Sequence, residues 1–410
     1  MGKTGFNPRV IHIADLRQAA RELEQVGADR QGCRFMAPKA VHRLIKVERL
    51  TPRAANLLKQ EMLARGGEAA VSRGVADWSV EYTDALLMGT VRQFRLLIRK
   101  LKLQPFGLAR LAGELEAVLQ NLEAPPGPDI PCGPLTIRPG SRTYVMGILN
   151  VTPDSFSDGG HYNDVEAAVA RAREMVDQGA DIIDIGAEST RPGHSPLSAE
   201  EELARLLPVL EHLQDRLPVP ISVDTYKPEV AREALRRGAC IINDVGGLYL
   251  DPEMAKVAAE FDVPLIIMHG LAEHRQGSWP RYPSIMGELV AFFRRGLEVA
   301  AEAGVPPRKV IIDPGIGFGK IAEDNLEIMN RLAELRSLGR PILVGTSRKS
   351  TIGKVLDLPV GERLEGTAAT VALCIAGGAD IVRVHDVKEM VRVARMSDAV
   401  VRWRSSGKAE

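Results

Sequence analysis

Residues 146–160 read Met-Gly-Ile-Leu-Asn-Val-Thr-Pro-Asp-Ser-Phe-Ser-Asp-Gly-Gly. The apolar run that begins at Tyr144 ends in the carboxamide of Asn150, and a segment rich in Ser, Asp and Gly follows at once. A buried strand that carries a polar side chain at its carboxyl end, under a loop, is how an α/β barrel presents functional groups. An ordinary strand-to-helix turn looks similar, so recurrence of the pattern decides between the two.

The pattern recurs through the last two-thirds of the chain, where short β-branched runs alternate with amphipathic helical patterns. Eight strand patterns, each followed by a helix, predict a (β/α)₈ TIM barrel. The strands are almost continuously apolar, as in Ala-Asp-Ile-Ile-Asp-Ile-Gly-Ala at 180–187, which is typical of a parallel sheet buried on both faces. A doubly wound open sheet is the alternative, but it usually has a glycine-rich first turn, which is missing here. The expected strands are 143–150, 180–187, 219–225, 240–247, 264–270, 310–316, 341–347 and 379–386, and the expected helices include 165–178, 199–215, 228–238, 284–303, 323–338 and 361–376.

A proline-rich segment divides the chain. Residues 123–134 hold five prolines and two glycines, which predicts a linker between a domain at 1–122 and the barrel domain at 135–405. We expect 134–142 to form a short strand or hairpin that plugs the barrel floor. Helical and strand patterns before the linker predict a small α+β domain of unknown role. These helices are expected near 14–26, 52–65, 90–103 and 107–122, and the strands near 41–48 and 80–88.

Composition restricts the possible partners. The 410 residues are 45% hydrophobic and 26% charged with no formal net charge, so there is no general case for binding to nucleic acid or to a membrane. Residues 1–123 hold 20 Lys and Arg against 13 Asp and Glu, about +7, which leaves about −7 for the remainder. A basic run between Arg92 and Lys102 is interpreted as a solvated helix face, with an anionic partner as the alternative. Four scattered cysteines and the lack of an 18-residue apolar run favour a cytoplasmic protein.

Polar side chains gather where the eight apolar runs stop. The carboxyl ends of barrel strands meet at one rim, so we expect a functional site there. The groups at these strand ends are Asn150, 188–193, Asp224, 243–244, 268–269, 313–320, 347–350 and 383–386.

The residue types predict two clusters at this rim. The first has donors and acceptors that suit the edge of a polar heterocycle, and it consists of Asp224, Asn243, Asp313 and Lys349. The second is expected because the eighth strand of a closed barrel neighbours the first, which brings Asn150 to Arg383 and His385. Arg and His suit a phosphate or pyrophosphate, and Asn offers a neutral oxygen to Mg²⁺. The run Gly-Ile-Gly-Phe-Gly-Lys at 315–320 lacks the spacing of a phosphate loop, and no Gly-x-Ser-x-Gly elbow occurs.

In order along the chain, these motifs resemble those of dihydropteroate synthases. The segment at 147–160 is similar to the first signature of that family, and Glu-Ser-Thr-Arg-Pro-Gly at 188–193 to the second. The remaining matches are Ser-Val-Asp-Thr at 222–225, Ile-Asn-Asp-Val at 242–245, Asp-Pro-Gly-Ile-Gly-Phe-Gly-Lys at 313–320, Ser-Arg-Lys-Ser at 347–350 and Arg-Val-His-Asp-Val at 383–387. The resemblance covers about residues 143–395. It departs from the family around 269–283 and in the additional N-terminal domain.

The resemblance implies Mg²⁺-assisted condensation of 6-hydroxymethyl-7,8-dihydropterin pyrophosphate with p-aminobenzoate, giving 7,8-dihydropteroate and pyrophosphate in folate biosynthesis. It implies a homodimer, and a pocket in which sulfonamides compete. By the resemblance Asp224, Asn243, Asp313 and Lys349 bind the pterin; Asn150, Thr190, Arg383 and His385 bind the pyrophosphate, with Asn150 on Mg²⁺; and Arg191, Pro192, Phe318 and Ser347 bind p-aminobenzoate. Asp313, Lys349, Arg383 and His385 are the expected catalytic residues.

Two rival functions remain. A methyltetrahydrofolate:corrinoid methyltransferase would share the region around Asp224 and Asn243, but it needs neither the motif at 347–350 nor the one at 383–387. A barrel kept only as a pterin-binding or interaction module would be expected to lose Lys349, Asp313 or the first loop, and all of them are present. For the N-terminal domain, a regulatory or assembly role is favoured over a second catalytic activity.

Overall fold

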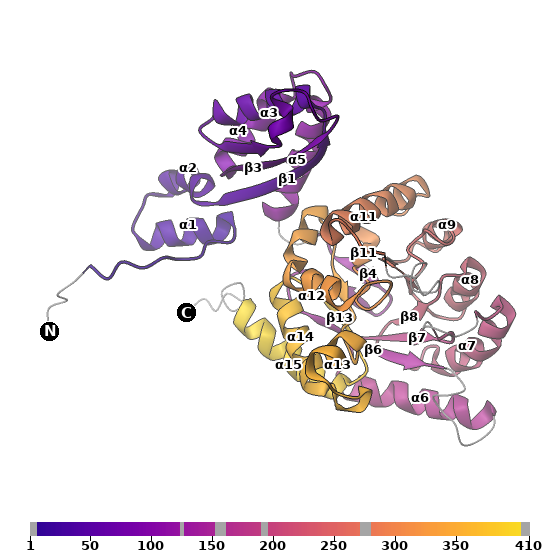
Figure 1. Cartoon of the computed structure of the whole chain (residues 1–410). Coiled ribbons are helices and arrows are strands. Elements are labelled where there is room, and N and C mark those ends of the chain that lie inside the picture. Colours follow the sequence, from indigo (N-terminus) through magenta and orange to yellow (C-terminus); the bar gives the residue numbers. More distant parts are fainter. Residues whose placement is uncertain (1–5, 124–126, 152–160, 190–195, 271–279, 403–410) are drawn as a thin grey trace, which may run out of the picture. The chain divides into compact units, whose positions relative to one another are not determined.

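The computed structural model describes residues 6–123, 127–151, 161–189, 196–270 and 280–402, without the side chains of 161–164 (Figure 1). The chain forms two compact units, Met1–Ala124 and Pro125–Glu410. Their boundary falls inside the proline-rich segment that the sequence marks as a linker.

The first unit is a small α+β domain. Its three-stranded antiparallel sheet has the order β1-β3-β2, with β1 at His42–Leu50, β2 at Glu68–Val71 and β3 at Thr83–Thr90. A core that includes Leu58, Leu87 and Phe94 joins this sheet to its helices. The helices are α1 (Leu16–Gln25), α2 (Arg30–Ala40), α3 (Pro52–Leu63), the short 3₁₀ turn η1 (Arg73–Val75), α4 (Val91–Leu101) and α5 (Leu108–Glu123).

The expected helices and strands of this domain are present, and the helix α2, the strand β2 and the 3₁₀ turn η1 were missed. Helix α2 contains Pro38 and Gly32, which both disfavour a helix interior, and β2 has only four residues. The basic face of α4 is exposed to solvent and partly paired. Arg95 bonds Glu123 at 2.6 Å and Lys102 bonds Glu116 at 2.8 Å, both on α5. These contacts favour the solvated-face interpretation.

The second unit is a closed parallel barrel, as predicted. Its eight strands follow the order β11-β10-β9-β8-β7-β6-β13-β12, and a parallel bridge between Ile312 and Ile342 joins the two ends. This closure excludes the open-sheet alternative. The strands are β6 (Tyr144–Asn150), β7 (Ile182–Gly186), β8 (Ile221–Asp224), β9 (Ile241–Asp244), β10 (Leu265–Met268), β11 (Val310–Asp313), β12 (Leu343–Val344) and β13 (Ile381–Val384).

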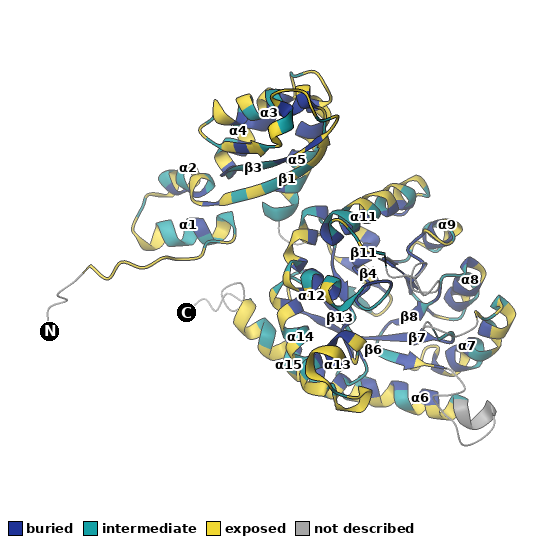
Figure 2. Ribbon diagram, in the orientation of Figure 1, coloured by how far each residue is buried: buried dark blue, intermediate teal, exposed yellow. Residues whose placement is uncertain are grey.

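Helices surround the barrel and cover it with their buried faces, while their outer faces are exposed (Figure 2). The buried faces pack on the outward-pointing residues of the strands, such as Ile183, Ile267 and Val382. The helices are α6 (His161–Asp177), α7 (Ala199–Leu213), α8 (Pro228–Arg236), α9 (Glu253–Glu260), α11 (Ile285–Glu302), α12 (Ala322–Asn330), α13 (Ser350–Leu356), α14 (Leu364–Ala376) and α15 (Val387–Val401), with 3₁₀ turns η3 (Pro307–Lys309), η4 (Leu332–Leu338) and η5 (Val360–Glu362).

A hairpin packs against the floor of the barrel, but it begins earlier than expected. Strands β4 (Ile130–Cys132) and β5 (Leu135–Ile137) pair antiparallel. The last part of the predicted linker at 123–134 therefore belongs to this hairpin. A two-stranded hairpin has only edge strands, and an edge strand tolerates a proline such as Pro131. Ile130 and Ile137 are fully buried in one cluster with residues of the barrel interior, including Met146 and Ile241.

Candidate active site

A polar layer lies directly above this apolar floor, inside the barrel. Side chains of a strand alternate between its two faces, so a residue two positions beyond a floor residue also points inward. On four strands this step leads from a floor isoleucine to a polar group. The four pairs are Ile182 and Asp184 on β7, Ile241 and Asn243 on β9, Ile311 and Asp313 on β11, and Ile381 and Arg383 on β13.

Arg383 is the centre of this layer. Its Nε donates to Oδ2 of Asp184 at 2.6 Å and its Nη2 donates to Oδ2 of Asp224 at 2.6 Å. Nδ2 of Asn243 also donates to Oδ2 of Asp184, at 3.1 Å. The strands β13, β7 and β9 are not neighbours in the sheet, so these contacts cross the barrel interior. Burial lowers the pKa of Arg383, but the two carboxylates outweigh burial and hold that pKa above its usual value.

Asp184 is the main residue that sequence reasoning missed. Its side chain is fully buried, and its Oδ1 has no hydrogen-bond partner among the described residues. An aspartate inside the apolar run at 180–187 was the available signal, since a buried carboxylate needs a partner. The structure also changes the predicted clusters. Arg383 was expected beside Asn150 and His385, yet its guanidinium binds the carboxylate of Asp224, so the two clusters share it.

Asp313 lies in the same polar layer, and a hydrogen bond from the backbone holds its carboxylate. Its Oδ1 accepts from the Gly315 amide at 2.8 Å. Burial raises the pKa of Asp313 to about 6, although the Gly315 amide and the Lys349 charge act to lower it. Gly315 has a φ of +65°, and a Cβ there would lie 1.9 Å from the His269 carbonyl oxygen, so only glycine fits this turn.

Lys349 and Phe318 form one wall of the site. The Lys349 Nζ lies 3.9 Å from the centroid of the Phe318 ring, a cation–π contact. Phe318 also packs against the small apolar cluster of Val245 and Met268. A flat apolar wall beside the polar layer suits a planar heterocycle.

Lys320 serves the loop rather than a phosphate. Its buried Nζ donates to the carbonyl oxygens of His269 at 3.2 Å, Gly315 at 3.1 Å and Phe318 at 2.9 Å. These three bonds hold the segment after β11 against the segment after β10. Lys320, the lysine of the Gly-Ile-Gly-Phe-Gly-Lys run at 315–320, therefore has a structural role.

His385 and Ser347 contact each other at the ends of β13 and β12. The Ser347 Oγ lies 3.0 Å from Nδ1 of His385, and the backbone amide of His385 donates to the same oxygen at 3.2 Å. Burial, and next the charge of Arg383, lower the pKa of His385 to about 3. This imidazole is therefore neutral near pH 7.

The other predicted ligands lie at the rim or outside the described residues. Asn150 is exposed at the carboxyl end of β6, and β6 pairs directly with β13, which carries Arg383. Thr190, Arg191 and Pro192 fall outside the described residues. In the described part of the chain, no group of three His, Cys, Asp or Glu side chains could hold a metal ion.

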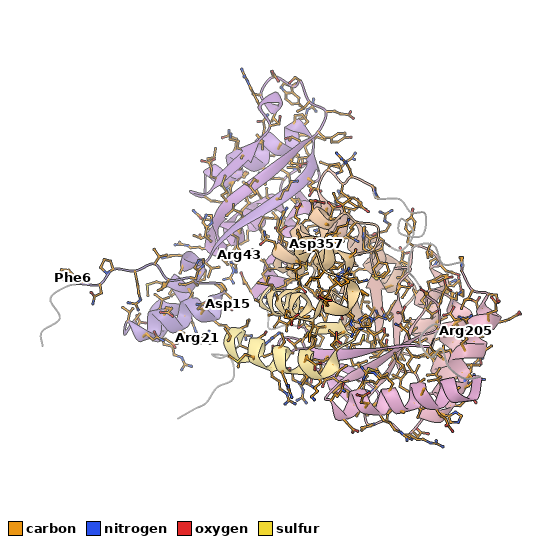
Figure 3. All side chains as sticks on the ribbon, turned by 60° about the horizontal axis from the view of Figure 1, so that its bottom comes forward. Phe6, Asp15, Arg21, Arg43, Arg205 and Asp357 are labelled. Atoms are coloured by element: carbon orange, nitrogen blue, oxygen red, sulfur yellow. The ribbon has the colours of Figure 1, made fainter. Side chains whose placement is uncertain are left out.

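A buried ionic network supports the start of the second signature. Lys227 bonds the carboxylates of Glu188 and Glu202, and the Tyr226 hydroxyl donates to Glu188 Oε1 at 3.1 Å. Arg205 on α7, labelled in Figure 3, donates to the Ala187 carbonyl oxygen at 3.4 Å. The network was not predicted, because only the fold brings its members together.

Comparison with known proteins agrees with this geometry. Residues 146–385 match the family described as pterin binding enzyme. The chain is 53% identical to the dihydropteroate synthase of Bacillus subtilis (strain 168) over 260 residues, which cover 63% of this chain and 89% of the relative. The chain belongs to the dihydropteroate synthase family. It is thus a transferase of folate biosynthesis.

Solved structures of dihydropteroate synthases match about two-thirds of this chain. One from Clostridium difficile, determined in the presence of pteroic acid, has a TM-score of 0.62 and 53% identity, covering 64% of this chain and 98% of that one. One from Xanthomonas albilineans in complex with 7,8-dihydropteroate has a TM-score of 0.61 and 39% identity, covering 67% of this chain and 98% of that one.

A different relative reaches beyond the barrel. A probable bifunctional folylpolyglutamate synthase/dihydropteroate synthase of Halobacterium salinarum is 46% identical over 388 residues, or 94% of this chain. This chain spans only 46% of that relative. The match therefore includes most of the N-terminal domain. Within the described residues, no helix is both long and apolar enough to cross a membrane.

The Asp184→Asn substitution should damage both stability and pterin binding. It removes one of the two carboxylates that bond the buried Arg383, and breaking such a pair costs on the order of 3 kcal/mol. We expect a lower free energy of unfolding in denaturant titration and weaker pterin binding in calorimetry. Asp181→Asn is the matched control, because it weakens a pair with Arg142, whose side chain is 46% exposed. Equal effects of the two substitutions would contradict the role of Asp184.

The Asp313→Asn substitution should stabilise the protein in a pH-dependent way. Asp313 has a folded-state pKa of about 6, above its ordinary value of 3.8, so its ionisation costs stability as the pH rises between these values, and the full cost is present above pH 6. From that shift we expect the variant to gain up to about 3 kcal/mol at pH 7, and about half as much at pH 5. Urea titrations of both proteins at the two pH values measure this difference. A gain that does not depend on pH would rule out the ionised carboxylate as its source.

Proposed function

We propose that the rim of this barrel joins the pterin pyrophosphate to p-aminobenzoate by a largely dissociative substitution. The observation that carries the proposal is the polar layer above the apolar floor, in which Asp224, Asn243 and Asp313 face one interior space. Their acceptors and donors suit the N–H groups and carbonyl of a pterin edge. Lys349 and the Phe318 ring offer a wall for the ring faces, in contact with Met268.

The leaving pyrophosphate would be held between β13 and β6. Arg383 and His385 come from β13, while Asn150 ends the paired strand β6, and Thr190 is assigned here by resemblance. The side chain of Asn150 is a suitable ligand for Mg²⁺. Asn150 offers an exposed oxygen at the rim, and Mg²⁺ usually keeps waters and substrate phosphates as its remaining ligands. When bound, Mg²⁺ would neutralise charge that develops on the pyrophosphate.

The proposed reaction does not require a strong general base from the protein. Loss of pyrophosphate leaves a cation delocalised from the methylene carbon into the pterin ring, and the carboxylate of Asp313 would stabilise it electrostatically. An arylamine is neutral at pH 7 and already nucleophilic, so it needs no strong general base. Its pKa of about 3 makes His385 a weak base, which agrees with a binding role.

Among the residues that the resemblance assigns to p-aminobenzoate, Arg191, Pro192 and Phe318 would form the pocket, in which sulfonamides would compete. The fourth, Ser347, contacts His385 instead. Phe318 lies beside Lys349, so it could separate the pterin from the aminobenzoate. The sulfonamide part of this proposal is supported by a structure of the Yersinia pestis dihydropteroate synthase with a sulfonamide drug complex, which is 41% identical and has a TM-score of 0.62.

We further propose a homodimer that uses α13, α14 and α15. Large apolar side chains on these helices are exposed, among them Val355 at 59%, Leu373 at 65% and Met396 at 65%. Exposed apolar area of this kind often marks a protein interface. A cytoplasmic location is supported by the four free cysteines. For the N-terminal domain, we propose a regulatory or assembly role.

The Asn150→Ala substitution tests the metal assignment. Wild-type protein with Mg²⁺ and both substrates should release pyrophosphate and form dihydropteroate in equal amounts, and removal of Mg²⁺ with a chelator should stop turnover reversibly. In Asn150→Ala, we expect the Mg²⁺ concentration for half-maximal turnover to rise on the order of tenfold, with binding of the free pterin unchanged. An unchanged Mg²⁺ requirement would remove Asn150 from the metal site, and absence of product in the wild type would refute the reaction.

The Leu373→Glu substitution tests the dimer. A charge within an apolar interface is costly to bury, so the variant should lose association. Light scattering should give twice the chain mass of 44.6 kDa for the wild type and the single chain mass for the variant. Leu326→Glu on α12 is the control, since this leucine is 43% exposed outside the proposed interface. A monomeric wild type, or a dimeric Leu373→Glu, would contradict the assignment.

A further inference from the structure

Ser347 is enclosed with His385 at the carboxyl ends of two paired strands. It follows β12, while His385 follows β13 directly, and the two strands are hydrogen-bonded neighbours. The Ser347 side chain is buried, with 3% of the residue exposed. Among the described residues, its hydroxyl contacts two atoms, the backbone nitrogen and Nδ1 of His385.

The number of hydrogens that these atoms can donate determines the direction of both hydrogen bonds. A serine hydroxyl has one hydrogen to donate and lone pairs that accept. The backbone N–H of His385 can only donate, so at 3.2 Å it occupies a lone pair of Oγ. The hydroxyl hydrogen then has one described partner left, Nδ1 of His385 at 3.0 Å. Because a buried donor is costly to leave unpaired, the hydroxyl donates and Nδ1 accepts.

This bond determines where the imidazole proton resides. His385 is neutral, since burial and the charges of Arg383 and Arg348 all lower its pKa. A neutral imidazole carries one N–H, and a nitrogen that accepts a hydrogen bond is not the one that carries it. The proton is therefore on Nε2, at the edge of the ring turned away from β12.

We propose that Ser347 is a positioning residue that holds His385 in the Nε2–H tautomer, so that the ring presents a donor to the leaving pyrophosphate. The inference rests on the proposed function for the binding of pyrophosphate at His385. Phosphate oxygens are acceptors, and a ring turned to the other tautomer would face them with a lone pair. The assignment also moves Ser347 away from the aminobenzoate pocket, where the family resemblance had placed its side chain.

The tautomer can be measured without substrate. In protein labelled with ¹⁵N-histidine, the two ring nitrogens have distinct shifts in the two tautomers, and the His385→Gln spectrum identifies the signal among the eight histidines. We expect the Nε2–H form in the wild type and in Ser347→Thr, and a mixture or the Nδ1–H form in Ser347→Ala. If the alanine variant does not fold, Ser347→Cys keeps a similar volume with a far weaker donor. An Nε2–H signal that survives both Ala and Cys would overturn the proposal.

Kinetics separate this role from a direct contact with p-aminobenzoate. Ser347→Ala should raise KM for the pterin pyrophosphate on the order of tenfold, with KM for p-aminobenzoate unchanged. The double variant with His385→Gln should be no worse than His385→Gln alone, because the serine acts through the histidine. A selective rise in KM for p-aminobenzoate would overturn the proposal. Lack of turnover in the wild type would refute the proposed function instead and leave the tautomer measurement valid.

Discussion

A buried guanidinium between two carboxylates is the interaction on which this site depends. Arg383 extends from β13 across the barrel to Asp184 on β7 and to Asp224 on β8. Each of these charges would be costly in the barrel interior alone, and together they compensate one another. The arrangement fixes the carboxylate of Asp224 in place before any ligand arrives. It also sets the electrostatic surroundings of Asp313, whose pKa Arg383 acts to lower.

The apolar floor and the polar layer above it follow from one geometric rule. Residues two apart on a strand share a face, so the floor isoleucines and the polar groups are consecutive inward positions of the same strands. The hairpin of β4 and β5 packs on the floor and completes an apolar base. Burial is what raises the pKa of Asp313, and the same burial strengthens its electrostatic action on a ligand.

The sequence predicted the barrel well, because periodicity along the chain determines strands and helices locally. It also predicted that polar residues lie at the carboxyl ends of the strands, and Asp224, Asn243, Asp313 and Arg383 do end or nearly end their strands. It did not predict the partners. Arg383 was expected beside Asn150 and His385, yet its long side chain reaches Asp184 on β7, and no local pattern in the sequence predicts such a contact. Asp184 was not predicted as a site residue because it stands inside an apolar run. The strand β4 was not predicted because it contains Pro131, although an edge strand tolerates a proline.

The pairing of Arg383 has a consequence for how the enzyme is made. Asp184 precedes Arg383 by 199 positions, and Asp224 precedes it by 159. During synthesis both carboxylates leave the ribosome long before their cation exists, so the growing half-barrel cannot bury them at low cost. The interior is completed only when the last strand is released, and such late, long-range contacts generally form slowly and leave intermediates that are prone to aggregation. A protein shortened before β13 would therefore lose its fold as well as its chemistry.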